Sequence, residues 1–307
     1  MQAHGIASKK ATLIGVVAIL LWSSMIGLIR SVSEILGPLG GAAVTYTIAA
    51  ILLFITVGLP DLRRIPRLYL VIGGALFVAC ETCLSLSIGK AQNGRQVIEV
   101  GMVNYLWPSL TMTFAILFNG RKSSFLIAPG LALAVLGTFW ILGGDQGFAL
   151  DEMLDNIRTN PVSYGLALGA ALNWAAYCSV TSGIAKGANG ITLFMILTAL
   201  TLWTIYLVGD GPAMRFNYHV IAYVLMAATA MGFGYVAWNI GILHGNVTVL
   251  AGASYFTPVL SSTFSAVLLR APLSLAFWQG AFMVSAGSTL CWWATREKPT
   301  KVRGQVN

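Results

Sequence analysis

Apolar residues fill ten long runs along the chain, and short polar segments between them hold most of the charged residues. Each run has about 20 residues, the length that an α-helix needs to cross roughly 30 Å of hydrocarbon. Because lipid cannot satisfy exposed backbone N–H and C=O groups, such runs predict helices and an all-α integral membrane protein. The predicted spans are 11–30, 38–58, 68–89, 97–118, 124–143, 162–185, 190–209, 217–241, 247–269 and 275–295.

A segment of the fourth run returns in the ninth at an offset of 150 residues, where Asn104–Pro108 corresponds to Ser254–Pro258. The identities in this register pair Tyr105 with Tyr255, Pro108 with Pro258, Leu110 with Leu260, Thr113 with Thr263, Phe114 with Phe264 and Gly137 with Gly287. Five spans separate the two copies, and this odd number means that they cross the membrane in opposite directions. The pattern predicts two inverted five-helix repeats around a central cavity, an arrangement typical of transporters.

The boundary between the repeats is the longest polar segment of the chain. We expect the first repeat at 1–143, a periplasmic connecting loop at 144–161, and the second repeat with a cytoplasmic tail at 162–307. Four apolar residues in the loop follow the i, i+3, i+4, i+7 spacing of one helix face: Leu150, Met153, Leu154 and Ile157. This spacing predicts a short amphipathic helix on the outer surface.

The spacing Gly165-x-x-x-Gly169 in the sixth predicted span allows two helices to approach closely. We expect this stripe to pack inside the bundle, and a dimer face is the alternative. The protein is expected to function as a monomer surrounded by membrane lipid.

The composition agrees with a membrane protein, since 57% of the residues are hydrophobic and 9% are charged. Soluble domains carry about 25% charged residues. Twelve of the 18 Lys and Arg residues fall on the side of the predicted N-terminus, which places both termini in the cytoplasm. The net charge of +8 therefore reflects topology and contact with anionic lipid, and nucleic acid is not an expected partner.

Pro108 and Pro258 fall in the middle of their predicted spans, where each would remove a helical hydrogen bond and free the carbonyl four residues earlier. Those carbonyls belong to Asn104 and Ser254. We interpret the two prolines as helix hinges beside a lined cavity. The alternative is that they only bend their helices.

Glu81 is the only acid deep inside a predicted span. Burying a carboxylate in a membrane costs at least a few kcal/mol, so such a residue is a functional candidate. It could accept a substrate ammonium group or carry a proton, and a structural hydrogen bond is the alternative to both.

Aromatic side chains with polar tips recur at helical spacing, and several lie too deep for the interfacial belts. In mid-span their N–H and O–H groups need partners, and such rings suit flat, amphipathic solutes. Plain core packing is the alternative for each of them. The candidates for the substrate cavity are Trp22, Tyr46, Glu81, Asn104, Tyr105, Trp107, Trp174, Tyr177, Tyr235, Trp238, Asn239 and Tyr255.

Motifs for catalysis, cofactors and metals are absent from the sequence. Cys80 and Cys83 have the spacing of a redox pair, but they lie in an apolar helix without a second Cys or His pair, so packing is expected. The chain has no GxxxxGK[ST] phosphate loop, which leaves a solute or ion gradient as the driving force. We therefore expect no enzyme activity, no cofactor and no metal.

Ten helices in two inverted repeats, with proline-marked fourth and ninth helices, resemble the drug/metabolite transporter superfamily and its EamA-type repeats. More specific likeness lies in Lys10–Gly15, Ile98–Ser109, Gly241–Thr248, Ala251–Ser262 and Ala276–Ala281. These segments resemble the bacterial aromatic amino acid exporters of the YddG type. The resemblance implies a carrier of the bacterial inner membrane that exports aromatic and other neutral amino acids.

The expected function is secondary export by alternating access. A superfamily branch that carries nucleotide sugars or organic phosphates is an alternative, but it would need Lys or Arg in mid-span, and every basic residue falls near a helix end. An intramembrane transferase would need a paired acid or His site. A channel would conduct without saturation.

Overall fold

The computed structural model describes residues 2–119, 124–142, 145, 150–186, 188–209, 213–244, 250 and 253–294. These residues form helices and no strands, which confirms the all-α prediction. The first half contains α1 (Gln2–Leu36), α2 (Pro38–Thr56), the π-helical turn η1 (Tyr69–Gly73), α3 (Gly74–Lys90), α4 (Gly94–Asn104), α5 (Trp107–Asn119) and α6 (Ile127–Leu142). After α7 (Leu150–Thr159), the second half contains α8 (Pro161–Ile184), α9 (Ile191–Val208), α10 (Tyr218–His244), α12 (Thr257–Leu268) and α13 (Leu275–Ala294).

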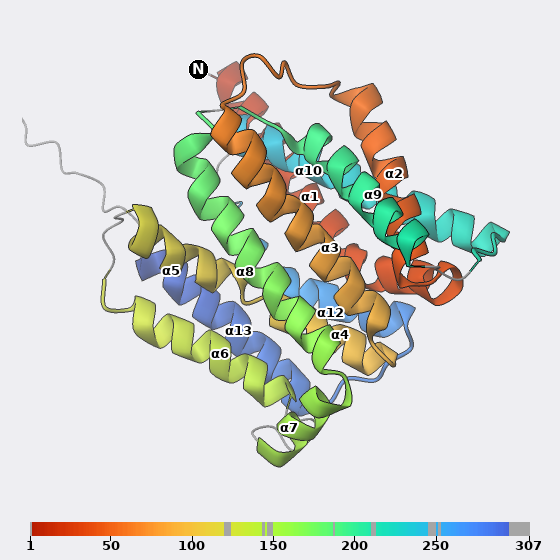
Figure 1. Ribbon diagram of the computed structural model, residues 1–307. Coiled ribbons are helices and arrows are strands. Elements are labelled where there is room, and N and C mark those ends of the chain that lie inside the picture. Colours follow the sequence, from red (N-terminus) through yellow and green to blue (C-terminus); the bar gives the residue numbers. More distant parts are fainter. Residues whose placement is uncertain are drawn as a thin grey trace, which may run out of the picture.

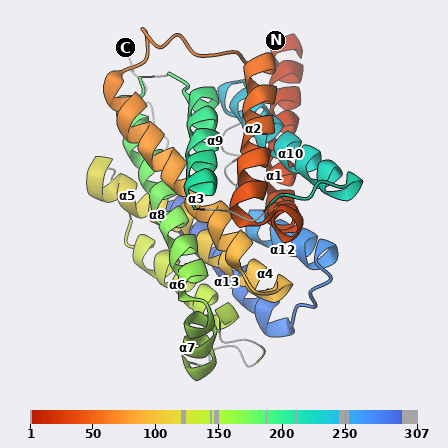
Figure 2. The ribbon, with the colours of Figure 1, turned by 45° about the vertical axis from the view of Figure 1, so that its right-hand side comes forward.

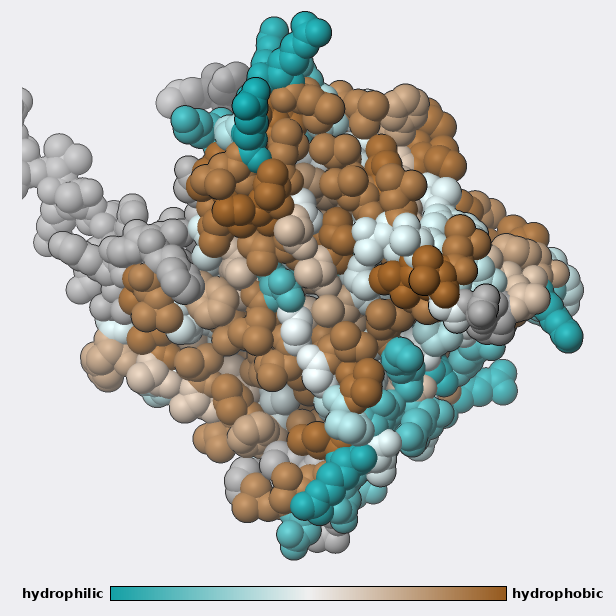
Figure 3. Space-filling view, in the orientation of Figure 1, coloured by the Kyte–Doolittle hydropathy of each residue, from teal (hydrophilic) through white to brown (hydrophobic). Residues whose placement is uncertain are grey.

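Five stretches of helix among the described residues are long and apolar enough to cross a membrane. They are Lys9–Leu36, Pro38–Thr56, Tyr69–Lys90, Ile191–Val208 and Tyr218–Trp238. Shorter apolar helices lie at Ile127–Leu142 and Thr257–Leu268. Large apolar side chains are exposed on helices all round the bundle, among them Ile55 (73%), Val208 (81%) and Phe282 (71%). Figure 3 shows apolar surface over most of this face, with hydrophilic residues gathered toward its upper and lower ends, as expected for a bundle surrounded by lipid.

The prediction that both prolines interrupt the middle of a continuous helix is wrong. The fourth predicted span divides into α4 and α5, and Pro108 is the second residue of α5. Pro258 is likewise the second residue of α12, next to a turn at residues 255–256. Proline lacks an N–H and clashes with the preceding turn, so the chain starts a new helix at the position where proline is tolerated.

The two breaks have the same hydrogen bonds. The Leu106 N–H donates to the Val103 carbonyl at 3.2 Å, and the Phe256 N–H donates to the Ala253 carbonyl at 3.1 Å. The new helices begin in the same way, with the N–H groups of Leu110 and Leu260 bonded to the carbonyls of residues 106 and 256 at 3.1 and 3.0 Å. The repeat in the sequence therefore corresponds to a repeat in backbone structure.

The helix predicted in the connecting loop is confirmed as α7. Ile157 packs against a small cluster that includes Val100, Leu142 and Tyr164, whereas Leu154 is exposed. Figures 1 and 2 show α7 at the opposite end of the molecule from the N-terminal end of α1.

Close helix contact occurs between α6 and α13, which lie side by side (Figure 1). A Cβ on Gly137 would lie 2.8 Å from the Gly280 carbonyl oxygen, and one on Gly287 would lie 2.6 Å from the Gly130 oxygen. Only glycine permits such an approach. The predicted stripe on α8 behaves differently, because a Cβ on Gly165 would meet nothing within 4 Å. The expectation that this stripe packs tightly inside the bundle is therefore wrong.

Candidate functional site

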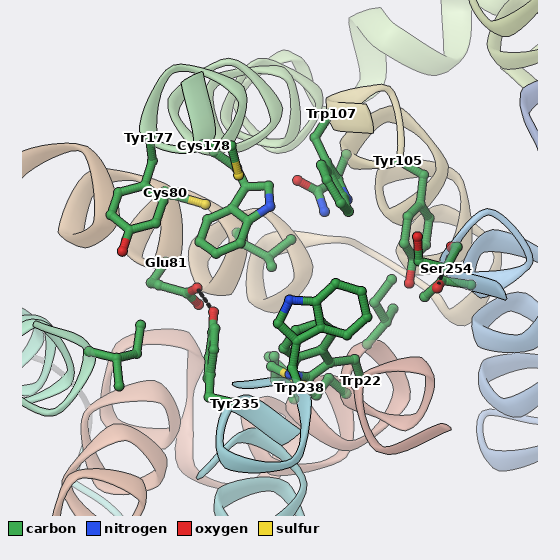
Figure 4. Close-up of a pocket in the computed structure, with 18 of the residues that line it drawn as sticks. Trp22, Cys80, Glu81, Tyr105, Trp107, Tyr177, Cys178, Tyr235, Trp238 and Ser254 are labelled. Atoms are coloured by element: carbon green, nitrogen blue, oxygen red, sulfur yellow. Dashed lines mark hydrogen bonds between the residues drawn. The ribbon is translucent and has the colours of Figure 1, made fainter. Parts of the chain in front are cut away.

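A cavity of about 420 Å³ lies at the centre of the described bundle, bordered by α1, α3, α4, α5, α8, α9, α10 and α12. Its volume is in the range of roughly 300–1,000 Å³ that small-molecule sites occupy. The lining residues are Trp22, Met25, Ile26, Ile29, Cys80, Glu81, Leu84, Asn104, Tyr105, Trp107, Trp174, Tyr177, Cys178, Thr181, Asn189, Ile191, Tyr235, Trp238, Ser254 and Thr257. Figure 4 shows the labelled rings converging from several helices on one space.

Aromatic rings form much of the cavity wall. On one side the Trp22 ring contacts those of Tyr235 and Trp238, at centroid distances of 5.2 and 5.3 Å. The Trp22 indole packs against α10 where Gly234 leaves room for it, since a Cβ there would lie 2.6 Å from the indole nitrogen. Such walls bury a flat apolar side chain and offer ring faces to a cation.

The opposite part of the wall is built around Trp174. This ring stacks on Tyr177 at 5.2 Å and contacts Trp107 edge-on at 6.2 Å. Phe77, fully buried behind them, contacts both Trp174 and Tyr177. The Tyr177 hydroxyl lies 3.3 Å from that of Tyr69, so this wall is fixed by contacts between α3, η1 and α8.

Glu81 is 5% exposed, and two tyrosines hold its carboxylate. Tyr46 donates to Oε2, and Tyr235 donates to Oε1 at 3.0 Å (Figure 4). No Lys, Arg or His is among the described residues that line the cavity. Glu81 is therefore the one charged group on this wall, and its charge has hydrogen bonds but no protein cation beside it.

Both breaks in the helices open onto the cavity. Asn104 and Trp107 flank the first break, Ser254 and Thr257 flank the second, and all four line the space. Asn104 is 9% exposed, and its side chain has no hydrogen-bond partner among the described residues. Asn104 and Trp107 were predicted to line the cavity, and the repeat in the sequence predicted Ser254 and Thr257 on an equivalent polar face beside it.

Nine of the twelve predicted cavity residues lie on this wall: Trp22, Glu81, Asn104, Tyr105, Trp107, Trp174, Tyr177, Tyr235 and Trp238. Tyr46 is fully buried behind Glu81 and reaches the site through its hydrogen bond. Tyr255 does not line the cavity, and its ring lies 6.1 Å from that of Trp292. The side chain of Asn239 lies outside the described residues.

Besides Ser254 and Thr257, four further polar or thiol-bearing lining residues are not among the twelve candidates: Cys80, Cys178, Thr181 and Asn189. Thr181 shares a helix face with Trp174 and Tyr177, so helical spacing could have identified it. Cys178 follows Tyr177 directly, and only the rotation of α8 decides that it reaches the cavity. Asn189 precedes α9 in a polar turn and carries no comparable signal in the sequence.

Glu99 is a second buried acid that the sequence analysis did not single out. It is 4% exposed and accepts a hydrogen bond from Tyr164 at 2.5 Å. Arg95, one turn earlier on α4, lies 3.3 Å from its Oε1 and also bonds Asp145 at 2.9 Å. Glu99 thus has a cation of its own and does not line the cavity.

The chain is similar to three bacterial proteins, each described as aromatic amino acid exporter YddG. It is 58% identical to that of Salmonella typhimurium over 95% of this chain and 99% of the relative. It is 59% identical to that of Escherichia coli (strain K12) over 94% and 98%. It is 27% identical to that of Ancylobacter novellus, over 83% of this chain and 87% of the relative. No protein-family model matches the chain.

A protein of known crystal structure, whose description gives no function, has the same fold. It superimposes with a TM-score of 0.66 at 25% identity, over 94% of this chain and 98% of the other.

Proposed function

Since the chain belongs to the YddG family of aromatic amino acid exporters, we propose that it exports aromatic and other neutral amino acids across the bacterial inner membrane by alternating access. The observation that carries the proposal is the central cavity, whose walls are aromatic and whose one charged residue, among the described lining residues, is Glu81. The ammonium group of a solute would bind the Glu81 carboxylate, and the aromatic rings would bury its side chain.

The helix contacts support two inverted repeats. The 150-residue offset makes α8 the equivalent of α1 and α10 the equivalent of α3. α1 packs on α10, and their repeat equivalents α8 and α3 pack on each other in the same way. α5 packs on α8 as α12 packs on α1. These reciprocal contacts are those expected of two five-helix units that face each other across a pseudo-two-fold axis.

The contact between α6 and α13 supports the same symmetry. Gly130 and Gly137 correspond to Gly280 and Gly287 at the 150-residue offset. In the structure Gly130 approaches Gly287, and Gly137 approaches Gly280. Gly130 thus contacts the repeat equivalent of Gly137, and Gly137 contacts the repeat equivalent of Gly130. Antiparallel helices related by a two-fold axis make such crossed contacts.

Transport measurements on purified protein in proteoliposomes test the proposal. Vesicles loaded with unlabelled tryptophan should accumulate labelled phenylalanine, tyrosine and tryptophan transiently and with saturation, because a carrier exchanges solutes across its membrane. Leucine should exchange more weakly, since it makes fewer ring contacts, and glutamate should not exchange beside the Glu81 carboxylate. Unsaturable flux without counterflow would indicate a channel, and the proposal would then fail.

Single cysteines test the proposed orientation, with both termini in the cytoplasm. A cysteine in the connecting loop at 144–161 should react with an impermeant maleimide added to intact cells, and one at 121–122 should react only after the cells are opened. Of the native cysteines, Cys80 and Cys291 are buried and Cys83 and Cys178 are half-buried, so protein with the native cysteines alone is the background control. Equal labelling at both sites in intact cells would contradict the ten-helix topology.

A further inference from the structure

We propose that the carboxylate of the transported amino acid binds at the N-terminus of α5, beside the Asn104 amide, while its ammonium group binds Glu81. This inference rests on the proposed function and names a second polar subsite in the same cavity. It would explain how a cavity wall without a described cation accepts a zwitterion.

The break between α4 and α5 places the start of a helix at the cavity. The first N–H groups of a helix have no partners within the helix, and they carry a partial positive charge that favours anions. In α5 these are the N–H groups of Trp107 and Ser109, since Pro108 has none and that of Leu110 is bonded to the Leu106 carbonyl. α5 has 13 residues and begins at Trp107, which lines the cavity. A membrane transporter can use such a half-helix to hold an anionic group of its substrate.

The Asn104 side chain offers hydrogen-bond donors at this break. It lies directly before the break, lines the cavity, is 9% exposed, and has no hydrogen-bond partner among the described residues. Its amide is not among the described polar atoms shut off from solvent, so it is accessible from the cavity, and its NH₂ group can donate two hydrogen bonds. A carboxylate only accepts hydrogen bonds, so it is the complementary ligand.

This subsite and Glu81 border the same cavity. An amino acid carries its ammonium and carboxylate groups on one carbon, so the two subsites must border the same part of the cavity. Trp174 contacts Trp107 at 6.2 Å and Tyr235 at 6.4 Å, and Tyr235 donates directly to Glu81. Trp174 therefore borders both the start of α5 and the tyrosine that holds the acid. Figure 4 shows Ser254, beside the second break, on the far side of the cavity from Glu81.

The test is competition against phenylalanine counterflow in proteoliposomes, with L-phenylalanine and 2-phenylethylamine as competitors. The amine has the same ring and ammonium group but no carboxylate. Asn104→Ala should weaken competition by phenylalanine about tenfold or more and leave competition by phenylethylamine within about twofold, because the lost hydrogen bonds are to a charged group. Asn104→Asp should weaken phenylalanine further, since it places a negative charge beside the carboxylate.

Ser254→Ala, at the repeat-equivalent position, is the matched control and should keep the wild-type ratio of the two apparent affinities. An equal loss for both competitors in Asn104→Ala and Asn104→Asp, or no loss for either, would overturn the carboxylate subsite. The proposed function would survive that result as long as wild-type protein shows saturable aromatic counterflow. Absence of counterflow in wild type would instead overturn the proposed function, and the subsite with it.

Discussion

Glu81 and Glu99 are buried to the same extent, but their surroundings differ. They are 5% and 4% exposed, and each accepts a hydrogen bond from a tyrosine hydroxyl. Glu99 also has Arg95 at 3.3 Å, whereas Glu81 has no cation among its described contacts. Glu99 lies in the middle of α4 and contacts Tyr164 of α8, whereas Glu81 faces the central cavity.

Burial alone therefore does not distinguish a structural acid from a functional one. A buried carboxylate whose charge is balanced within the protein has its partner already and stabilises the contact between its helices. A buried carboxylate held by neutral donors keeps a charge that a ligand or a proton can balance. We therefore propose a binding role for Glu81 and a role in helix assembly for Glu99.

The largest effect is expected from Glu81→Gln, which keeps the shape of the side chain and removes its charge. Loss of a desolvated charge pair costs about 2–5 kcal/mol, so apparent affinity for phenylalanine should fall at least about tenfold. If Glu81 carries a coupling proton instead, the variant loses accumulation driven by a pH gradient and keeps exchange. Counterflow and pH-jump uptake separate the two roles, and a folded variant with neither change would remove Glu81 from the mechanism.

A smaller effect, on stability rather than transport, is expected at the second acid. Arg95→Gln leaves the Glu99 carboxylate buried without its cation, and loss of a hydrogen bond to a charged group costs about 1.5–3 kcal/mol. Because the Arg95 side chain is 46% exposed, we expect the lower end of this range. Thermal unfolding in detergent measures the loss, and phenylalanine affinity serves as the control. Reduced affinity with unchanged stability would reverse the assignment.

The smallest effects are expected from removing one hydroxyl beside each acid. Tyr235→Phe and Tyr164→Phe each delete one hydrogen bond to a carboxylate and keep the ring. A loss of about 1–2 kcal/mol should appear as a severalfold lower phenylalanine affinity for Tyr235→Phe and as a lower unfolding temperature for Tyr164→Phe. Similar effects of the two variants on affinity would show that the two carboxylates are not functionally distinct.

Much of the candidate site was predictable because it depends on local spacing. Trp174 and Tyr177 share a helix face, and Trp107 lies next to a proline that the repeat identifies. Tyr255 shows the limit of this reasoning. It is the repeat equivalent of Tyr105, yet only Tyr105 lines the cavity, because the two repeats pack with different side chains around their equivalent breaks.

The sequence by itself determined the apolar runs, the 150-residue repeat, the positions of the two prolines, the helix at α7 and the buried acid in the third span. Apart from the repeat, which is read by comparing two segments, these are periodicities or compositions within one segment, and they constrain the backbone wherever that segment lies. Only the tertiary structure decided that the prolines start new helices, that Tyr46 and Tyr235 hold Glu81, and that Glu99 is paired. Those outcomes depend on how neighbouring helices are rotated and how closely they pack, and partners from distant segments leave no local pattern in the chain.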